Sequence, residues 1–210
     1  MTSESPAADR SPVIPGKIFH FIGGRLLPSA GGGTFDVADP TTNQVYAQVA
    51  AGDAGDVGQA VEAAAEAFTL GPWPRLAARA RAKILNRIAD GIEARGDEIA
   101  ATETFDTGLP ITQARGQAAR AAENFRYFAD VIVAQHEDAF SQPGQLGYVL
   151  RQPAGVAGLI TPWNTPFMLE SWKLAPALAS GCAVVLKPAE WTPLSASVLP
   201  EIMTDRKSVV

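Results

Sequence analysis

The chain has 210 residues, of which 47% are hydrophobic and 19% charged, and its formal net charge is −5. So many apolar side chains can form a core, which excludes disorder of the whole chain. The slight acidic excess, with no basic run, argues against nucleic acid and against a membrane surface as partners.

The stretch from Met1 to Gly16 is rich in Pro, Ser and Ala and lacks the basic and the continuous apolar segments of a signal peptide. No window of the sequence approaches the roughly 18 unbroken apolar residues that a membrane helix needs. The single cysteine, Cys182, excludes an intramolecular disulfide. We therefore expect a flexible arm over residues 1–17 and a cytoplasmic location.

Short strands and turns are predicted from about His20 to Ala50. The segments, in chain order, are Phe19–Leu27 around a Gly23–Gly24 turn, a Gly31–Gly33 loop, Thr34–Ala38 and Gln44–Val49.

Four helices are predicted next. The first begins after Asp53, a candidate N-cap, and ends at Gly71–Pro72. Its apolar stripe consists of Val57, Ala60, Val61, Ala64 and Phe68. The other three helices are Arg75–Arg95, Asp97–Asp106 and Ile111–Ala134, with Gly108-Leu109-Pro110 as the stop after the third helix. The basic residues of the second helix are interpreted as a solvated face, formed by Arg79, Arg81, Lys83 and Arg87.

Apolar strands alternate with helices in the last third of the chain. A loop at Ser141–Gly144 and a strand at Gly147–Gln152 come before this part. The alternating elements are the strand Val156–Thr161, the helix Phe167–Ser180, the strand Ala183–Leu186 and the helix Leu194–Met203. Fully apolar strands separated by helices indicate an α/β fold, with a parallel sheet covered on both faces.

Two prolines, a Trp and an Asn follow the first of these apolar strands, in Thr161-Pro162-Trp163-Asn164-Thr165-Pro166. Ligands of open α/β sheets collect at the carboxyl ends of the strands. The prolines restrict the backbone around Asn164, whose amide is a neutral donor suited to an oxyanion. The alternative is a rigid turn with an Asx hydrogen bond, and this stretch alone does not decide between the two.

A Lys and a Glu three residues apart follow the second apolar strand, at Lys187 and Glu190. An ammonium can bind ribose hydroxyls, and a carboxylate near the end of a second strand is the expected partner of a nucleotide ribose. The alternative is a helix start with Thr192 as cap, Pro193 at the first helical position and Glu190 solvated. Taken alone, these residues favour the helix start.

Taken together, the two strand ends and the helix between them resemble the aldehyde dehydrogenase superfamily, over residues 18–205. The matching positions are Gly155-Val156, Ile160-Thr161-Pro162-Trp163-Asn164, Trp172-Lys173, Pro176-Ala177-Leu178-Ala179, Gly181, Lys187-Pro188-Ala189-Glu190 and Thr192-Pro193, with Phe21-Ile22-Gly23-Gly24, Asp39-Pro40, Ala60–Phe68, Glu103 and Asp106-Thr107-Gly108 upstream. Within the superfamily, three segments are most similar to the carboxymethyl-hydroxymuconate semialdehyde dehydrogenases of aromatic catabolism: Thr104–Ile111, Arg120–Ala129 and Trp163–Met168.

The resemblance implies the N-terminal part of the aldehyde dehydrogenase fold: helices plus the first strands of a Rossmann-like parallel sheet, which is incomplete. On this basis residues 18–140 form small strands and helices that pack on the cofactor domain, and residues 141–153 a strand region linked to oligomer contacts. Residues 154–205 begin the NAD-binding domain, and residues 206–210 form an atypical tail.

For the full-length protein, the resemblance implies NAD-dependent oxidation of an aldehyde to a carboxylic acid through a cysteine thiohemiacetal. It assigns the oxyanion-hole donor to Asn164 and the contacts to the adenosine ribose to Lys187 and Glu190. The residues expected to line the nucleotide cleft are Ile160, Thr161, Pro162 and Trp163. The Glu190 carboxylate would repel a phosphate on the ribose, which favours NAD over NADP.

The nucleophilic cysteine and the general-base glutamate of the family have no counterpart in this chain, which departs from the family pattern in Arg206–Val210. Cys182 stands where the family commonly has Asn and is interpreted as a structural cysteine. We therefore expect a truncated chain that is inactive by itself, and a full-length protein that is a homo-oligomer, either dimer or tetramer. The alternative is a non-catalytic nucleotide-binding or subunit-interaction fragment.

Two other kinds of site are disfavoured. Neither His20 nor His136 has a second metal-binding residue type beside it, so no metal site is expected. The sequence also has no Gly-x-Ser-x-Gly elbow, and this argues against a serine hydrolase that uses Ser171, Ser180 or Ser195.

Overall fold

The computed structural model describes residue 12 and residues 14–204. Most of the arm predicted over residues 1–17 lies outside the described residues, and so does the whole tail predicted over residues 206–210. No helix in the described part is long and apolar enough to cross a membrane.

The short strands predicted for the first part of the chain are present, and they pair into two small sheets. The first sheet has the strand order β1-β5-β4, in which β1 is parallel and β4 antiparallel to β5, and the second is a β2–β3 hairpin. The hairpin turns at Gly23 and Gly24, whose φ angles of 57° and 76° suit glycine. The strands are β1 Lys17–Ile18, β2 His20–Ile22, β3 Arg25–Leu27, β4 Thr34–Ala38 and β5 Val45–Ala50.

Helix α1 (Ala54–Leu70) begins at the predicted N-cap. The Asp53 carboxylate accepts hydrogen bonds from the amides of Gly55 and Asp56, and the Asp56 carboxylate accepts one from the amide of Asp53. The helix contacts β8 and β9, but its predicted apolar stripe is only partly covered: Val57 is 56% exposed, whereas Ala64 is buried. A sheet of two strands is too narrow to cover the whole stripe.

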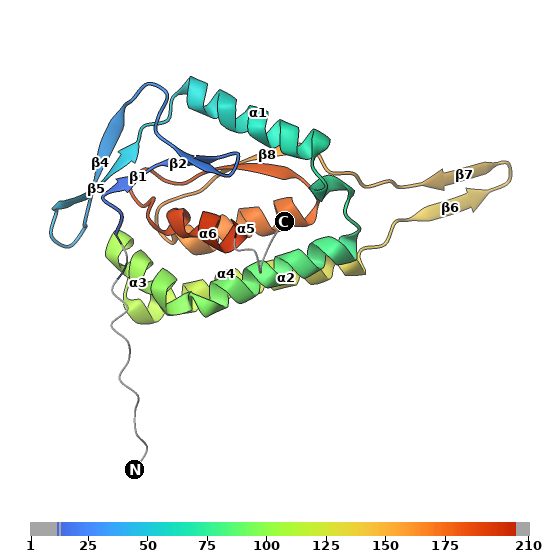
Figure 1. Cartoon of the computed structure of the whole chain (residues 1–210). Helices are drawn as coiled ribbons and strands as arrows, with labels where there is room; N and C mark the ends of the chain where they lie inside the picture. The colour runs from blue at the N-terminus through green and yellow to red at the C-terminus, as the bar shows by residue number, and fades with distance from the viewer. Residues whose placement is uncertain (1–11, 13, 205–210) are drawn as a thin grey trace, which may run out of the picture.

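Three helices form a separate layer below the sheets (Figure 1). The layer contains α2 Ala78–Ala94, α3 Gly96–Thr107 and α4 Ile111–Ala134, and the short helix η1 Trp73–Arg75 lies on the connection from α1 to α2. The second helix thus starts three residues later than predicted, because Leu76 and Ala77 have extended backbones after the Trp73–Arg75 turn. The small residues of α4 let it pack closely on α2, and the shared core includes Leu85, Ile88, Ile92, Ala118, Ala121, Ala122 and Phe125.

A β-hairpin projects from the body of the molecule, far from the other elements (Figure 1). Its strands are β6 (Ala139–Gln142) and β7 (Gln145–Tyr148), joined by Pro143 and by Gly144 at φ 77°. The predictions were wrong here in two respects. The loop expected at Ser141–Gly144 is only a two-residue turn, and the strand expected at Gly147–Gln152 ends at Tyr148. Because Gly144 adopts a positive φ, a connection of only two residues is enough, and the strands pair up to the residues directly before and after the turn.

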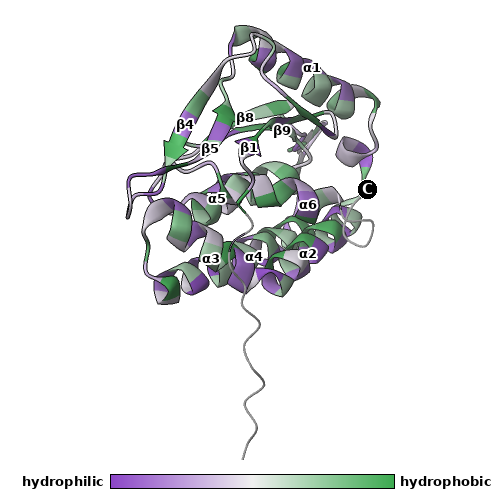
Figure 2. Ribbon diagram, turned by 60° about the vertical axis from the view of Figure 1, so that its left-hand side comes forward, coloured by the Kyte–Doolittle hydropathy of each residue, from purple (hydrophilic) through white to green (hydrophobic). Residues whose placement is uncertain are grey.

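The last third of the chain contains the predicted strand–helix–strand unit. Strands β8 (Val156–Ile160) and β9 (Ala183–Lys187) pair in parallel, and α5 (Pro166–Ala179) connects them. Both α1 and α5 contact the strands, and Figure 2 shows β8 and β9 between these two helices. The final helix was predicted as one element, but it consists of η2 (Ser195–Val198) and α6 (Leu199–Thr204).

Candidate functional site

The loops that follow β8 and β9 lie side by side at the carboxyl edge of the parallel sheet. The Thr161 amide donates to the carbonyl of Lys187 at 3.2 Å, and the Thr192 hydroxyl donates to the carbonyl of Trp163 at 3.2 Å. The rings of Trp163 and Trp191 lie beside each other with centroids 6.3 Å apart and their planes tilted by 42°. The structure therefore brings together the two polar segments that the sequence placed at the ends of these strands.

Lys187 and Glu190 form an ion pair at this edge. The Lys187 Nζ and Glu190 Oε1 atoms are 3.0 Å apart, and both side chains are more than half exposed. Hydrogen bonds from the Glu190 amide and from Lys187 lower the pKa of the Glu190 carboxyl, so it is ionised at neutral pH. An exposed ammonium beside a carboxylate provides donors and acceptors for the two hydroxyls of a ribose, so the residues present fit the nucleotide half of NAD.

Asn164 lies in the other loop, two residues before the first residue of α5, and its side chain is exposed. Within the described residues, no hydrogen bond holds its amide, so the alternative of an Asx turn is not seen there. The amide is thus free to donate to a ligand at the sheet edge. This arrangement has the features of an oxyanion donor: a neutral group near a helix N-terminus, with Pro162 and Pro166 on either side.

The four residues expected to line the nucleotide cleft differ in exposure. Ile160, the last residue of β8, is 69% exposed, and Pro162 and Trp163 are also exposed. Thr161 is buried, and its Oγ1 has no hydrogen-bond partner among the described residues. Three of these side chains can thus contact a ligand directly, whereas Thr161 offers mainly its backbone.

Two carboxyl groups that the sequence analysis gave no role hold the far ends of both loops. Glu103 Oε1 accepts a hydrogen bond from the Phe167 amide at 2.9 Å, and Asp106 Oδ2 accepts one from the Leu194 amide at 2.9 Å. The Tyr46 hydroxyl donates to the other oxygen of Asp106. The local sequence gave one indication of such a role: the two acids are three residues apart on a helix, beside buried apolar positions such as Ile99.

Burial dominates the ionisation of these acids. It raises the pKa of Glu103 to about 7, against the opposing effect of the Phe167 amide, and the pKa of Asp106 to about 6, against the Tyr46 and backbone hydrogen bonds. Burial also raises the pKa of Glu170, on α5, to about 8, and the charges of Glu103 and Asp106 add to this effect. Glu170 is fully buried, and within the described residues neither of its oxygens has a hydrogen-bond partner.

Cys182 lies at the opposite end of the sheet from the two loops. It comes directly before β9, whereas Lys187 ends that strand, and the residue is only 4% exposed. The Ser180 hydroxyl oxygen, which donates to the Ala177 carbonyl, lies 3.4 Å from the Cys182 sulfur. The thiol therefore does not face the candidate site, in agreement with the structural role expected for it.

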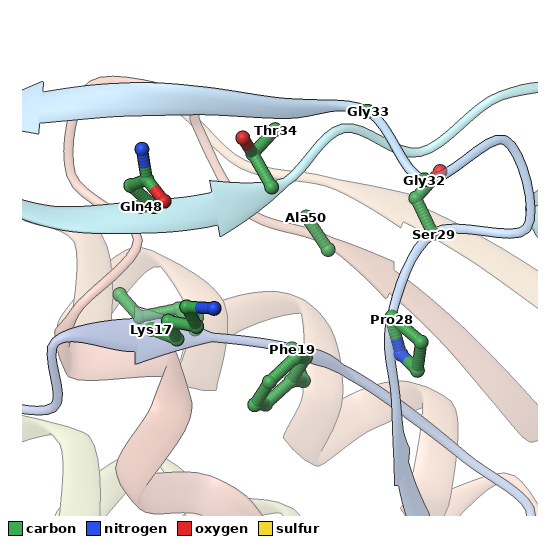
Figure 3. Close-up of a pocket in the computed structure, with 10 residues that line it drawn as sticks. Lys17, Phe19, Pro28, Ser29, Gly32, Gly33, Thr34, Gln48 and Ala50 are labelled. Atoms are coloured by element: carbon green, nitrogen blue, oxygen red, sulfur yellow. The ribbon is translucent and has the colours of Figure 1, made fainter.

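A small cavity of about 40 Å³ lies between the amino-terminal strands, away from the candidate site (Figure 3). Phe19, Pro28, Thr34 and Ala50 are among its lining residues. This volume is far below the roughly 300 Å³ of ordinary ligand pockets, so it cannot hold a nucleotide. Within residues 14–204, no three His, Cys, Asp or Glu side chains are grouped so that they could hold a metal ion.

Comparison with known proteins gives a consistent picture. The model of the aldehyde dehydrogenase family matches residues 27–207. The chain is 49% identical to aldehyde dehydrogenase 1 of Tanacetum cinerariifolium, and the match covers 83% of the chain and 35% of the relative. It is 42% identical to 5-carboxymethyl-2-hydroxymuconate semialdehyde dehydrogenase of Escherichia coli, and this match covers 89% of the chain and 39% of the relative.

The same fold occurs in solved structures. The NAD-dependent aldehyde dehydrogenase from Sinorhizobium meliloti superposes with a TM-score of 0.85 at 38% identity, over 90% of this chain and 38% of that one. The chain therefore spans less than two fifths of the length of these relatives, and its elements form the N-terminal part of their fold.

Proposed function

The chain belongs to the aldehyde dehydrogenase family. We propose that it carries the adenosine-binding edge and the oxyanion donor of an enzyme that oxidises an aldehyde to a carboxylic acid with NAD. The observation that carries the proposal is the exposed Lys187–Glu190 pair, next to Asn164 in the neighbouring loop, at the carboxyl edge of a parallel sheet. The similarity to a semialdehyde dehydrogenase supports a semialdehyde of aromatic catabolism as the substrate.

Each residue of this edge has a separate part in the proposed mechanism. Lys187 donates to a ribose hydroxyl and Glu190 accepts from one, while Ile160, Pro162 and Trp163 contact the nucleotide around them. NAD held by these residues would supply the hydride acceptor of the oxidation. Asn164 donates to the oxygen that becomes negative when a cysteine thiolate attacks the aldehyde and forms a thiohemiacetal.

The charge of Glu190 supports NAD over NADP. The lowered pKa of this carboxyl keeps it ionised, and a 2′-phosphate on the ribose would bring a second negative charge close to it. The Sinorhizobium meliloti protein, which is named NAD-dependent, is consistent with this choice.

Within residues 1–210, Cys182 is the single thiol, and it is buried away from the sheet edge. We therefore propose that this chain binds nucleotide without turnover by itself. The competing description, a fragment that serves nucleotide binding or subunit contact without catalysis, is favoured by the projecting hairpin, in which Phe140 and Leu146 are more than half exposed. We propose a homo-oligomer, dimer or tetramer, for the whole protein, and a cytoplasmic location.

Calorimetric titration of the chain with NAD and with NADP, alongside a turnover assay with a muconic semialdehyde, tests these proposals. We expect NAD to bind more tightly than NADP. Glu190→Gln should weaken NAD binding by about tenfold and reduce the ratio of the affinities for NAD and NADP. Arg115→Ala is the matched control, because it removes an exposed ion pair with Asp97 outside the site. Equal NAD binding by wild type and Glu190→Gln would contradict the proposed site, and turnover by the purified chain would contradict its inactivity.

A further inference from the structure

Helix α3 carries two buried carboxyl groups, and each of them holds one of the two loops of the candidate site. We propose that Glu103 and Asp106 are positioning residues, which together set the spacing between the oxyanion donor Asn164 and the ribose pair Lys187–Glu190. The inference rests on the proposed function, and it assigns to α3 the alignment of the two halves of that site.

The first contact is at the N-terminus of α5. The amides of a first helical turn have no partner within the helix. The side chain of Thr165, at the N-cap position, makes no capping hydrogen bond, and Pro166 has no amide hydrogen to donate. The first available amide is that of Phe167, and it donates to Glu103 Oε1 at 2.9 Å. This cap lies three residues after Asn164, so it determines where the Asn164 loop enters the helix.

The second contact is at the start of η2. Leu194, at the N-cap position, has no side chain that could cap the helix, and its amide donates instead to Asp106 Oδ2 at 2.9 Å. The Tyr46 hydroxyl holds the other oxygen of Asp106, so the carboxylate is anchored from β5 as well. This cap lies four residues after Glu190, and the bond from Thr192 to the Trp163 carbonyl joins the two loops between the caps.

The two caps are part of one rigid element. Glu103 and Asp106 are three residues apart, so they project from the same face of α3 one turn apart. Their exposed fractions are 0% and 2%, so solvent does not compete for these oxygens in the folded protein. The two site loops therefore take their separation from a single helical turn. Loss of either carboxyl should release its own loop while the other loop stays in place.

The test combines four variants with amide hydrogen exchange and with AMP as the probe of the ribose half. For Asp106→Ala we expect faster exchange over residues 188–194 and roughly tenfold weaker AMP binding. For Glu103→Ala we expect faster exchange over residues 161–165, with AMP affinity changed by less than about threefold, because the ribose half keeps its own cap. Asp106→Asn and Glu103→Gln retain an oxygen acceptor, so each should restore slow exchange.

Glu170→Gln is the matched control, because Glu170 is buried beside the same acids but caps no helix. It should leave both exchange patterns and AMP affinity unchanged. Two outcomes would show that the acids are merely structural and that the inference is wrong. One is that both alanine variants speed up amide exchange in both loops equally. The other is that Asp106→Ala lowers stability but keeps wild-type AMP affinity and wild-type loop exchange. If the wild type bound no AMP while the loop-specific exchange persisted, the proposed function would fail and the positioning role would stand.

Discussion

Glu170 is the residue whose ionisation departs most from that of an ordinary carboxyl. It is fully buried with the acids Glu103 and Asp106 as neighbours, and their pKa values of about 8, 7 and 6 are all raised above the usual range near 4. The folded state therefore keeps protons that the unfolded chain releases. The stabilising effect of these groups is fully present below about pH 4 and is lost as the pH rises through the folded-state pKa values.

At the residue scale, this sign gives a prediction about pH. Between pH 5 and pH 8 the free energy of unfolding should fall with rising pH, and the share due to Glu170 should be ~1.4 kcal/mol per pH unit at most. Glu170→Gln should remove that share. Urea unfolding at several pH values measures the slope, and a stability that rises with pH, or a variant with an unchanged slope, would contradict the account.

The candidate site shows which residue roles can be predicted from sequence. Lys187, Glu190 and Asn164 could be found because each closely follows an apolar strand, and strand ends of an α/β unit gather at one edge. Glu103 and Asp106 could not be given a role in this way. Their partners Phe167 and Leu194 lie 64 and 88 positions away in the sequence. No local pattern reveals which distant amide a buried acid will cap.

At the scale of elements, boundaries were predicted well where a residue type determines the backbone. Asp53 and Gly108 mark the start of α1 and the end of α3. The hairpin strands β6 and β7 were misplaced, because nearly all their side chains are exposed and the sequence carries no buried face to define their register.

Two glycines, one at the end of a helix and one inside a helix, give a prediction at this scale. Gly108 caps α3 with φ 76°, a conformation that strains any residue with a Cβ, so Gly108→Ala should lower the free energy of unfolding by ~1 kcal/mol. Gly116 lies inside α4 with open space around it, so Gly116→Ala should instead raise stability, by up to ~1 kcal/mol. Chemical denaturation of both variants measures these effects, and a change of the same sign in the two would refute the explanation.

At the scale of the whole molecule, the larger of the two core clusters lies among the helices α2 to α6, and Phe125, on α4, is fully buried in it. Phe125→Ala should therefore lower the free energy of unfolding by roughly 3–5 kcal/mol. Leu70→Ala is the control, because Leu70 is 73% exposed and its loss should change stability by no more than about 0.5 kcal/mol. Thermal unfolding followed by circular dichroism compares the two, and equal shifts in Tm would mean that the core lies elsewhere.

The arrangement of the elements could be predicted from the sequence, whereas the extent to which they cover one another could not. The parallel pairing of β8 and β9, with helices on both faces, followed from apolar strands separated by a helix. The sequence did not indicate how much of α1 would be covered. Val57 and Val61 belong to its regular apolar stripe, but they are exposed because the sheet below them has only two strands. Periodicity identifies the face of a helix, whereas the width of the surface below it depends on the rest of the fold.

The central claim is that the two strand-end loops form the adenosine-binding edge of an aldehyde dehydrogenase, and a structure of the chain with NAD bound tests it most directly. The account predicts that the adenosine ribose lies at the carboxyl edge of β8 and β9, with its hydroxyls in hydrogen-bond contact with Lys187 and Glu190. A nucleotide bound elsewhere, or a ribose out of reach of both side chains, would contradict it.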